Sequence, residues 1–508
     1  TTLHADQSPK HKHQHKNKSA DKISLALKQT KKNKQTHYAV KVDQINLNRY
    51  LPLLEKQQWL GKDIKNYLIQ AKPRGQLEAV DFTVSLPNTL FNQPEQKNSQ
   101  LADKTFDLSD IKFSGKGSLH QLSVNRHDYH PPIKQLDLDF EINEKKGQLN
   151  FNLQDSAIDY PDWFHKPIPL EQLRGKVSIH KAEAAPQSWE ITIADFYLRN
   201  PDFQITGAGD INIPKKQPVF ADLRLEFHSR KVIKNISDYV PKIMSPTGKK
   251  WINEALLTVN IPRGEVIIKG YLNDLPFDAK NKQRQQQGQF EVNFDIDQTK
   301  MKPLDEWASI HDLRGHISFT NGAMQANVTG GRLMKTRLTE GQISIPTFRE
   351  NSRIHLKDLT VVGQLNNMVK VIKASPLGKS TADFFNSTTL TGKGKVAINV
   401  QAAFNRKQRN KEGIKTAVYL ETESASLHFK AAQQNFDNIN GEIYFHEKGI
   451  EAEKLQLTYR GQAATLSAKT SDNKRYLDLV LKQRNQLSDL LATQSKLNDL
   501  LTPFIQGD

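Results

Sequence analysis

Few side chains in this sequence have the types and the spacing that catalysis requires. Cysteine is absent from all 508 residues, which excludes thiol nucleophiles, disulfide frameworks and cysteine-based zinc sites. The metalloprotease pattern HExxH and the hydrolase pattern GxSxG do not occur either. The nearest match to a phosphate-binding loop is Gly378-Lys379-Ser380, but such a loop needs a Gly where Lys373 stands. We therefore expect no enzymatic activity and no cofactor.

Two further polar groupings are better explained by contact with water than by a site. His11, His13 and His15 alternate in a segment rich in Lys, Gln and Asn, where no fixed geometry would hold a metal ion. Because this segment has almost no apolar content, residues 1–37 are predicted to form a disordered basic tail or linker. Most acidic residues alternate with apolar ones, which indicates a solvated face and not the paired carboxylates of a glycosidase.

Apolar side chains carry the one strong pattern in the chain. Residues 136–142 read Leu-Asp-Leu-Asp-Phe-Glu-Ile, so the apolar and the acidic side chains of a strand point to opposite faces. The same alternation recurs at 149–153, 223–227, 290–296 and 477–481. Such a face has no reactive group, but it can shield hydrocarbon from water. Periodicity alone does not distinguish an ordinary protein core from the floor of a groove.

The elements that must position this face are antiparallel strands, which we predict for nearly the whole chain from Tyr38 onward. Helical spacing of apolar residues interrupts the strand pattern in four segments, which we expect to be short helices packed on the sheet or capping it. These segments are 50–70, 231–256, 365–386 and 485–502, with residues 485–508 taken as a C-terminal helix. The loops at 279–288 and 405–412 are predicted to be exposed hairpin connections.

Composition indicates a folded protein that faces water. Hydrophobic residues make up 37% and charged residues 25% of the chain, which excludes both a membrane-embedded bundle and a fully disordered chain. The sequence has no apolar run of the roughly 18 residues that span a bilayer and no signal peptide, so we expect it to be part of a longer polypeptide anchored upstream. Of the net charge of +17, residues 1–37 hold +7, and the rest is spread along the strands, which disfavours a nucleic-acid groove and allows attraction to anionic lipid surfaces.

A degenerate internal repeat supports a sheet that grows by addition of similar units. Residues 173–179, 313–319 and 439–445 share one order: aliphatic, polar, Gly, polar, aliphatic, polar, apolar. Each Gly is expected to follow a strand end and to open a new strand, as a turn or bulge without a role in binding. The spacing of the units is too irregular for a propeller or a short-period solenoid.

Short motifs stand in a fixed order along the chain and carry a family resemblance. The central ones are Tyr239-Val240-Pro241, Trp251, Ala255-Leu256, Gly264-Glu265-Val266 and Asp274-Leu275-Pro276-Phe277. Others are Lys72 to Leu77, Gly288 to Phe290, Trp307, Leu313 to Phe319 and Ser375-Pro376-Leu377. In this order they resemble the YhdP family, AsmA-like proteins of Gram-negative envelopes that are related to TamB. Val240 and Leu275 depart from the commoner Leu and Phe of the family.

The resemblance implies a fold and a function. The fold would be mostly β: a long antiparallel twisted sheet, curled into a U-shaped open groove over residues 38–484, with a few short helices. The function would be bridge-type phospholipid transport between the membranes, in support of the outer-membrane permeability barrier. The chain would be a periplasmic, monomeric conduit whose parent protein is anchored in the inner membrane. Its partners would be phospholipid acyl chains, both membranes through parts outside this chain, further envelope proteins and no nucleic acid.

On this hypothesis the apolar faces of the strands line the groove and contact lipid. The candidates are Leu136, Leu138, Phe140, Ile142, Leu149, Phe151, Leu153, Val177, Ile179, Leu223, Leu225, Phe227, Phe290, Val292, Phe294, Ile296, Ile317, Phe319, Ile443 and Phe445. The competing hypothesis is a β-scaffold that transports nothing, such as an assembly factor for outer-membrane proteins. The two hypotheses differ in one respect: whether the apolar face is open to a guest or filled by the chain itself.

Overall fold

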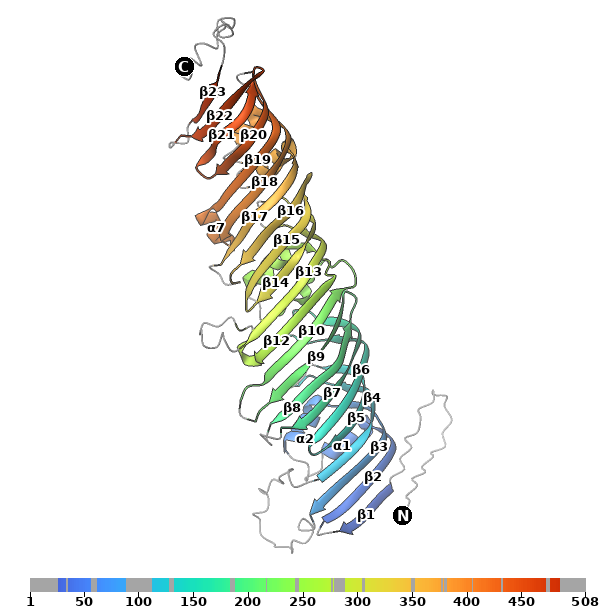
Figure 1. Ribbon diagram of the computed structural model, residues 1–508. Helices are drawn as coiled ribbons and strands as arrows, with labels where there is room; N and C mark the ends of the chain where they lie inside the picture. Colours follow the sequence, from blue (N-terminus) through green and yellow to red (C-terminus); the bar gives the residue numbers. More distant parts are fainter. Residues whose placement is uncertain are drawn as a thin grey trace, which may run out of the picture. The chain divides into compact units, whose positions relative to one another are not determined.

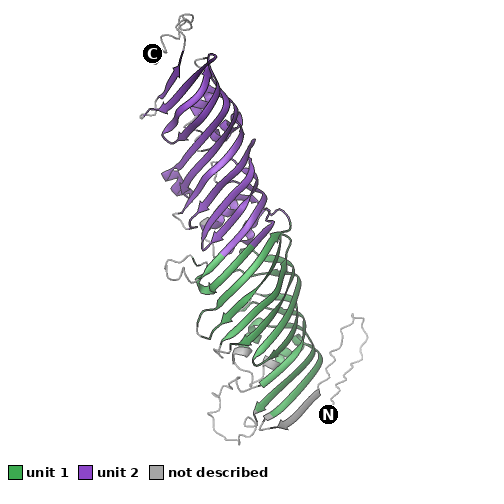
Figure 2. Cartoon of the chain, in the orientation of Figure 1, with its two compact units in different colours: residues 1–230, 265–290 green, residues 231–264, 291–508 purple. Residues whose placement is uncertain are grey.

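The chain divides into two compact units, each described here by itself (Figures 1 and 2). Unit 1 comprises residues 1–230 and 265–290, and unit 2 comprises residues 231–264 and 291–508. The computed structural model describes residues 26–32, 35–55, 62–87, 112–127, 132–182, 188–215, 217–242, 246–275, 277, 288–303, 307–348, 352–375, 378, 382–403, 405–430, 433–471 and 476–484.

Unit 1 is an antiparallel sheet with two helices near its N-terminal strands. Its elements are β1 (Ala26–Lys32), β2 (Gln35–Asn46), α1 (Leu47–Glu55), α2 (Lys62–Ala71), β3 (Arg74–Pro87), β4 (Lys112–Val124), β5 (Ile133–Asn143), β6 (Lys146–Ile158), β7 (Ile168–Lys181), β8 (Trp189–Arg199), β9 (Phe203–Ile213), β10 (Phe220–Ser229), most of β12 (Arg263–Tyr271) and the 3-10 turn η5 (Leu272–Asp274). From β1 to β10 each strand pairs with the next strand in the sequence. The pairing therefore follows the chain, as expected of an open sheet that grows by addition.

Unit 2 repeats this plan with more helices. Its elements are the 3-10 turn η4 (Ile236–Tyr239), α3 (Pro246–Ala255), β11 (Leu256–Thr258), most of β13 (Gln289–Met301), β14 (Ile310–Thr320), β15 (Ala323–Leu333), β16 (Thr336–Ile345), β17 (Arg353–Gln364), α5 (Leu365–Lys373), α6 (Ala382–Ser387), β18 (Thr388–Ala403), α7 (Arg406–Glu412), β19 (Ile414–Phe429), β20 (Gln434–His446), β21 (Gly449–Tyr459), β22 (Gln462–Thr470) and β23 (Leu477–Gln483). From β13 to β23 successive strands again pair antiparallel. The mostly β, antiparallel fold class predicted from the sequence is confirmed.

Many strands of both units contain one bulge at a polar residue with positive φ. Examples are Gln121 in β4, Asp358 in β17 and Ser424 in β19, with φ of 53°, 50° and 49°. The register of the adjacent pairing shifts at each of them. Because a bulge bends its strand and increases the local twist, the recurrence of bulges curls the sheet of each unit. The apolar residues of β4 accordingly change from odd to even positions, from Leu119 to Leu122, and keep to one face.

Side chains on the neighbouring strand satisfy the backbone N–H groups that the bulges leave unpaired. The N–H of Gln121 donates to Asp137 Oδ1 over 3.0 Å. In unit 2 the N–H of Asp358 donates to Asn399 Oδ1 and that of Ser424 to Asn440 Oδ1, each over 2.9 Å. Short polar side chains therefore have a structural task on the water-facing side of the sheet, where an unpaired donor would otherwise weaken the strand.

The predicted helices are largely confirmed, and one predicted connection contains a further helix. The segment 50–70 forms α1 and α2, 231–256 contains η4 and α3, and 365–386 forms α5 and α6. Residues 405–412 connect β18 to β19 and are mostly exposed, as expected, but they form helix α7, because the Asn405 side chain accepts from the N–H of Lys407 over 2.9 Å and Arg409 is buried against the carbonyl of Ala403. The predicted helix over 485–508 and the loop at 279–287 lie outside the described residues.

The first strand begins at Ala26, within the segment 1–37 that was predicted to be a disordered tail. Much of the segment 1–37 lies outside the described residues, but Ala26–Lys32 forms β1 and Gln35 opens β2. The two pair through a tight hairpin in which Lys32 faces Gln35. Backbone pairing to β2 supplies the order that the weakly apolar sequence of β1 did not predict.

The repeated glycines lie inside strands and do not open them, contrary to the prediction. Gly175 is within β7, Gly315 within β14 and Gly441 within β20. A Cβ added at Gly315 would lie 2.2 Å from the carbonyl oxygen of Asn327 on β15, and one at Gly175 would lie 2.8 Å from the Phe151 ring. The alternative expectation, a bulge, agrees better with the structure at Gly315, because the β14–β15 register shifts between Arg314 and Gly315. These positions need Gly because a neighbouring strand or ring approaches too closely for a side chain.

The close approach at Gly315 gives a direct test of this packing. We expect Gly315→Ala to lower the free energy of unfolding of unit 2 by about 1–3 kcal/mol, because backbone must move to admit the methyl group. Gly330→Ala on β15 is the matched control: nothing lies within 4 Å of its Cβ position, so a change within about 0.5 kcal/mol is expected. Urea denaturation followed by circular dichroism measures both, and equal losses would contradict the packing described here.

Candidate functional site

The apolar face of unit 1 consists of rows of side chains that run across the strands. Leu136 in β5 lies opposite Leu153 in β6, which lies opposite Leu173 in β7, and the row continues on the following strands. One residue from each strand from β4 to β10 takes part: Leu122, Leu136, Leu153, Leu173, Leu198, Ile205 and Phe227. Direct cross-strand pairs of this kind hold their side chains on one face of the sheet. The row is therefore a hydrocarbon stripe perpendicular to the strands.

Parallel rows extend this stripe into a surface. The second row contains Leu119, Leu138, Phe151 and Gly175, and the third contains Phe140, Leu149, Val177, Ile193, Gly209 and Leu223. A fourth contains Ile142, Gly147, Ile179, Ile191, Ile211 and Ala221. Glycines stand directly opposite large side chains within these rows, as Gly175 does opposite Phe151. The absence of a side chain there leaves room for the ring to lie over the neighbouring strand.

The apolar face of unit 1 is only partly buried. Among its predicted residues Leu153 is buried, with 5% of its surface exposed, and the others are half-buried. Leu153, Leu170 and Leu198 form a small buried cluster, with Leu136, Leu173 and Ile205 among the half-buried residues packed against it. The described part of unit 1 thus leaves hydrocarbon accessible on a face that its own side chains do not fill.

The opposite face of the same strands is polar and internally paired. Lys176 forms an ion pair with Asp195 at 2.8 Å, and His180 contacts Glu190 at the same distance. The pKa of the Asp195 carboxyl lies below its ordinary value, first because Lys176 donates a hydrogen bond to it and then because of the lysine charge. Since these charges are exposed, they contribute little to stability and chiefly keep this face in water.

The apolar face of unit 2 has the same rows, but most of their members are buried. One row runs through Phe294, Ile317, Ala326, Ile343, Leu356 and Val400 on successive strands. Ile343, Leu356 and Val400 are exposed by only 1–3%. The difference from unit 1 arises because helices and loops of the chain cover this face.

Helix α3 covers the beginning of this face. The Trp251 indole N–H donates to the carbonyl of Pro303 over 3.1 Å, and its ring lies 6.3 Å from that of Phe348. Between Trp251 and strands β13 to β16 remains an enclosed apolar space of about 20 Å³. A space of this size holds at most one water-sized group, so this part of unit 2 is closed to an acyl chain.

Helices α5 and α6 cover the later strands in the same way. Helix α5 packs against β17 and β18 and buries Met368, Val371 and Ile372. On α6 the Phe385 ring stacks on Phe445 with 5.9 Å between ring centres, and Phe445 is only 1% exposed. Phe445 therefore contacts the chain's own helix in this structure.

The structure places the predicted groove residues in two groups. In unit 1 the stripes of β5, β6, β7 and β10 share one face, and Phe290 is half-buried at the start of β13. In unit 2 Val292, Phe294 and Phe319 are half-buried, as is Ile443, whereas Ile296, Ile317 and Phe445 are buried. Ring stacking joins Phe294, Phe319 and Phe348 at about 6 Å.

Sequence reasoning missed several residues of the unit 1 face. Leu122, Ile193, Phe196 and Leu198 complete the rows, yet strict alternation does not find them. Along β8 the apolar positions change from odd to even between Ile193 and Phe196, at the bulge. A one-residue slip in the apolar period beside a polar residue is the signal that would have identified them.

Neither a metal-binding cluster nor a membrane-spanning helix occurs among the described residues. Within them no group of three or more His, Cys, Asp or Glu side chains could hold a metal ion. No helix in the described part of the chain combines the length and the apolar character needed to cross a bilayer.

Comparison with known proteins identifies a family for the chain. The model of the family described as YhdP protein matches residues 9–508, nearly the whole sequence. Searches of curated proteins and of solved structures gave no match.

The unequal burial of the unit 1 rows predicts unequal stability effects. Leu153→Ala is expected to lower the free energy of unfolding by about 2–5 kcal/mol, because it leaves a cavity in the buried cluster. Leu138→Ala, on the half-buried part of the same face, is expected to cost less than about 2 kcal/mol. Urea denaturation of both variants gives the comparison, and equal losses would show that this face is as closed as a protein core.

Proposed function

Because the chain belongs to the YhdP family, a lipid-transport family, we propose that it carries phospholipid between the two membranes of the Gram-negative envelope. The parent protein would be anchored in the inner membrane, with this chain in the periplasm. Lipid supplied in this way would support the permeability barrier of the outer membrane. Further envelope proteins are proposed as partners, and the chain would act as a monomer.

One observation carries the proposal: the accessible apolar face of unit 1. A phospholipid that leaves a bilayer exposes two acyl chains of about 16 carbons, at about 0.8 kcal/mol per CH₂ or about 25 kcal/mol in all. The half-buried rows through Leu138 and Phe140, beside the buried leucine cluster, offer the chains a hydrocarbon surface in place of water. Most of that energetic cost is removed while the headgroup stays hydrated at the edge.

The proposed mechanism requires only that neighbouring rows offer an acyl chain similar apolar contacts. Leucine, isoleucine and phenylalanine side chains in neighbouring rows contact hydrocarbon without directional bonds, so a lipid bound at one row loses little on moving to the next. No nucleotide-binding motif accompanies these rows in the sequence. Movement is therefore proposed to be passive or driven by a partner.

The closed face of unit 2 favours a different task for that unit. Its apolar side chains are covered by α3, α5 and α6, which is the arrangement that the scaffold hypothesis predicts. We infer that unit 2 in this conformation is a structural support, and that lipid contact through it would require α3 or α5 to move away. The scaffold hypothesis is thus retained for unit 2 and opposed by the open face of unit 1.

The test places a charge on the open face. Leu138→Asp, opposite Leu119 and Phe151, is expected to lower the phospholipid that co-purifies with the chain at least severalfold, because a carboxylate disfavours hydrocarbon beside it. Native mass spectrometry and lipid extraction measure the bound phospholipid. Gln154→Asp adds the same charge on the exposed polar face of β6, opposite Gln172, and should leave the bound lipid unchanged.

A second measurement separates lost binding from lost folding. A benzoylphenylalanine at position 138 should crosslink to phospholipid under illumination, whereas the same group at position 154 should not. The proposal would be overturned if Leu138→Asp left the bound lipid unchanged and the crosslinks appeared at both positions or at neither.

A further inference from the structure

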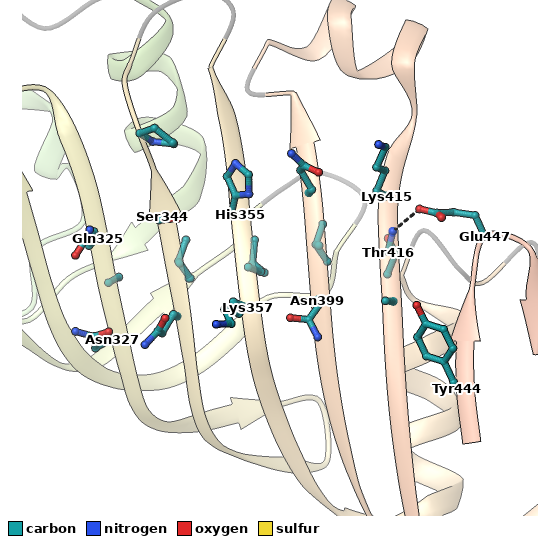
Figure 3. Close-up of a pocket in the computed structure, with 18 residues that line it drawn as sticks. Gln325, Asn327, Ser344, His355, Lys357, Asn399, Lys415, Thr416, Tyr444 and Glu447 are labelled. Carbon is teal, nitrogen blue, oxygen red and sulfur yellow. Dashed lines mark hydrogen bonds between the residues drawn. The ribbon is translucent and has the colours of Figure 1, made fainter. Parts of the chain in front are cut away.

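The polar face of unit 2 contains a hollow of about 710 Å³ across β15 to β19, on the side of the sheet opposite the buried rows (Figure 3). Ser344 and Ala417, which are small, lie within its lining. Longer polar side chains on the neighbouring strands line the rest of the hollow, and Figure 3 shows Gln325, His355 and Lys415 among them. None of the residues that line the hollow is used in the function proposed above for unit 1.

Carboxamides dominate the lining of this hollow. Gln325, Asn327, Gln342 and Gln401 contribute to it from three strands. A carboxamide both donates and accepts hydrogen bonds, so such a group suits a ligand whose own groups do both. Asn399 is already engaged by the bulge at Asp358, which fixes its orientation within the lining.

Stacked aromatic rings border the hollow on β19 and β20. The Tyr444 ring lies 4.5 Å from that of Tyr419, and 4.7 Å from that of His446 on the other side. Tyr444 lines the hollow, whereas Tyr419 stands beside the lining, stacked on Tyr444, and is 47% exposed. Burial, and a hydrogen bond with Tyr419, raise the pKa of the Tyr444 hydroxyl. An exposed ring beside hydrogen-bonding amides offers a flat apolar platform with polar surroundings.

The charge of the hollow is positive. Lys357 and Lys415 are exposed in its lining, and within the described residues neither has an ion-pair partner. His355 lies on the same face, two residues before Lys357 on β17 and opposite Gln401, which itself pairs with Lys415. The one carboxylate of the lining, Glu447, accepts a hydrogen bond from the backbone N–H of Thr416 over 2.9 Å and is thereby held at the margin (Figure 3).

We propose that this hollow binds an acidic glycan. A sugar ring has hydroxyl groups that both donate and accept and a face of C–H groups that packs on an aromatic ring, which matches the carboxamides and Tyr419. Carboxylates or phosphates on the sugars match Lys357 and Lys415. Unit 2 thus carries a polar binding face on the side of its sheet opposite the closed apolar one.

Titration calorimetry of the whole chain with two named sugars tests the proposal. A short oligogalacturonate should bind more tightly than neutral maltohexaose, and the difference should shrink with added salt. Tyr419→Ala should weaken oligogalacturonate binding about tenfold, as expected for the loss of one aromatic contact. The double substitution Lys357→Gln and Lys415→Gln should reduce the affinity for oligogalacturonate to that for maltohexaose.

Matched controls use residues of unit 2 away from the hollow. Tyr476→Ala removes an exposed tyrosine and Lys335→Gln an exposed turn lysine, and neither should change the affinity. Absence of oligogalacturonate binding, equal affinity for the two sugars, or equal losses in the control variants would overturn the proposal. So would binding of anionic vesicles, but not of sugars, that depends on Lys357 and Lys415.

Discussion

The structure of each unit depends on keeping the apolar side chains of every strand on one face while the strand itself bends. In a strand the side chains alternate with period two, so any inserted residue would turn the rest of the strand over. The bulges at Gln121, Asp195 and Ser424 insert that residue and compensate for it: the extra residue adopts positive φ, and the apolar positions change parity. Curvature and one-sided burial are therefore obtained together.

The strands and their faces could be predicted from the sequence where alternation is unbroken, as at Leu136 to Ile142 in β5. Prediction failed where the chain departs from that rule. Leu198 was missed because it follows a bulge, and β1 because its order comes from pairing with β2. Two of the residues that carry the family resemblance, Phe277 and Gly288, pack together: Phe277 is 2% exposed, and a Cβ at Gly288 would lie within 3 Å of its ring.

Accessibility of the apolar face is the property that the sequence could not reveal. The same alternating pattern gives a half-buried surface around Leu138 in unit 1 and a closed one around Ile343 in unit 2. What differs is the helices that cover the face, with the buried residues Trp251 on α3 and Met368 on α5. Helical periodicity predicted that these helices exist, but tertiary packing, which local periodicity does not encode, decides which strands each helix covers.

The side chains that cap the bulges, Asp137, Asn399 and Asn440, reach across to the next strand and bind its backbone. Each such hydrogen bond depends on the register of the strand pair, because it forms only if the two adjacent strands carry the correct number of residues between hairpin and bulge. Mispaired intermediates during synthesis would leave these amide hydrogens without acceptors on a wet surface. These hydrogen bonds on the polar face thereby favour the strand register that keeps the apolar side chains together on the opposite face.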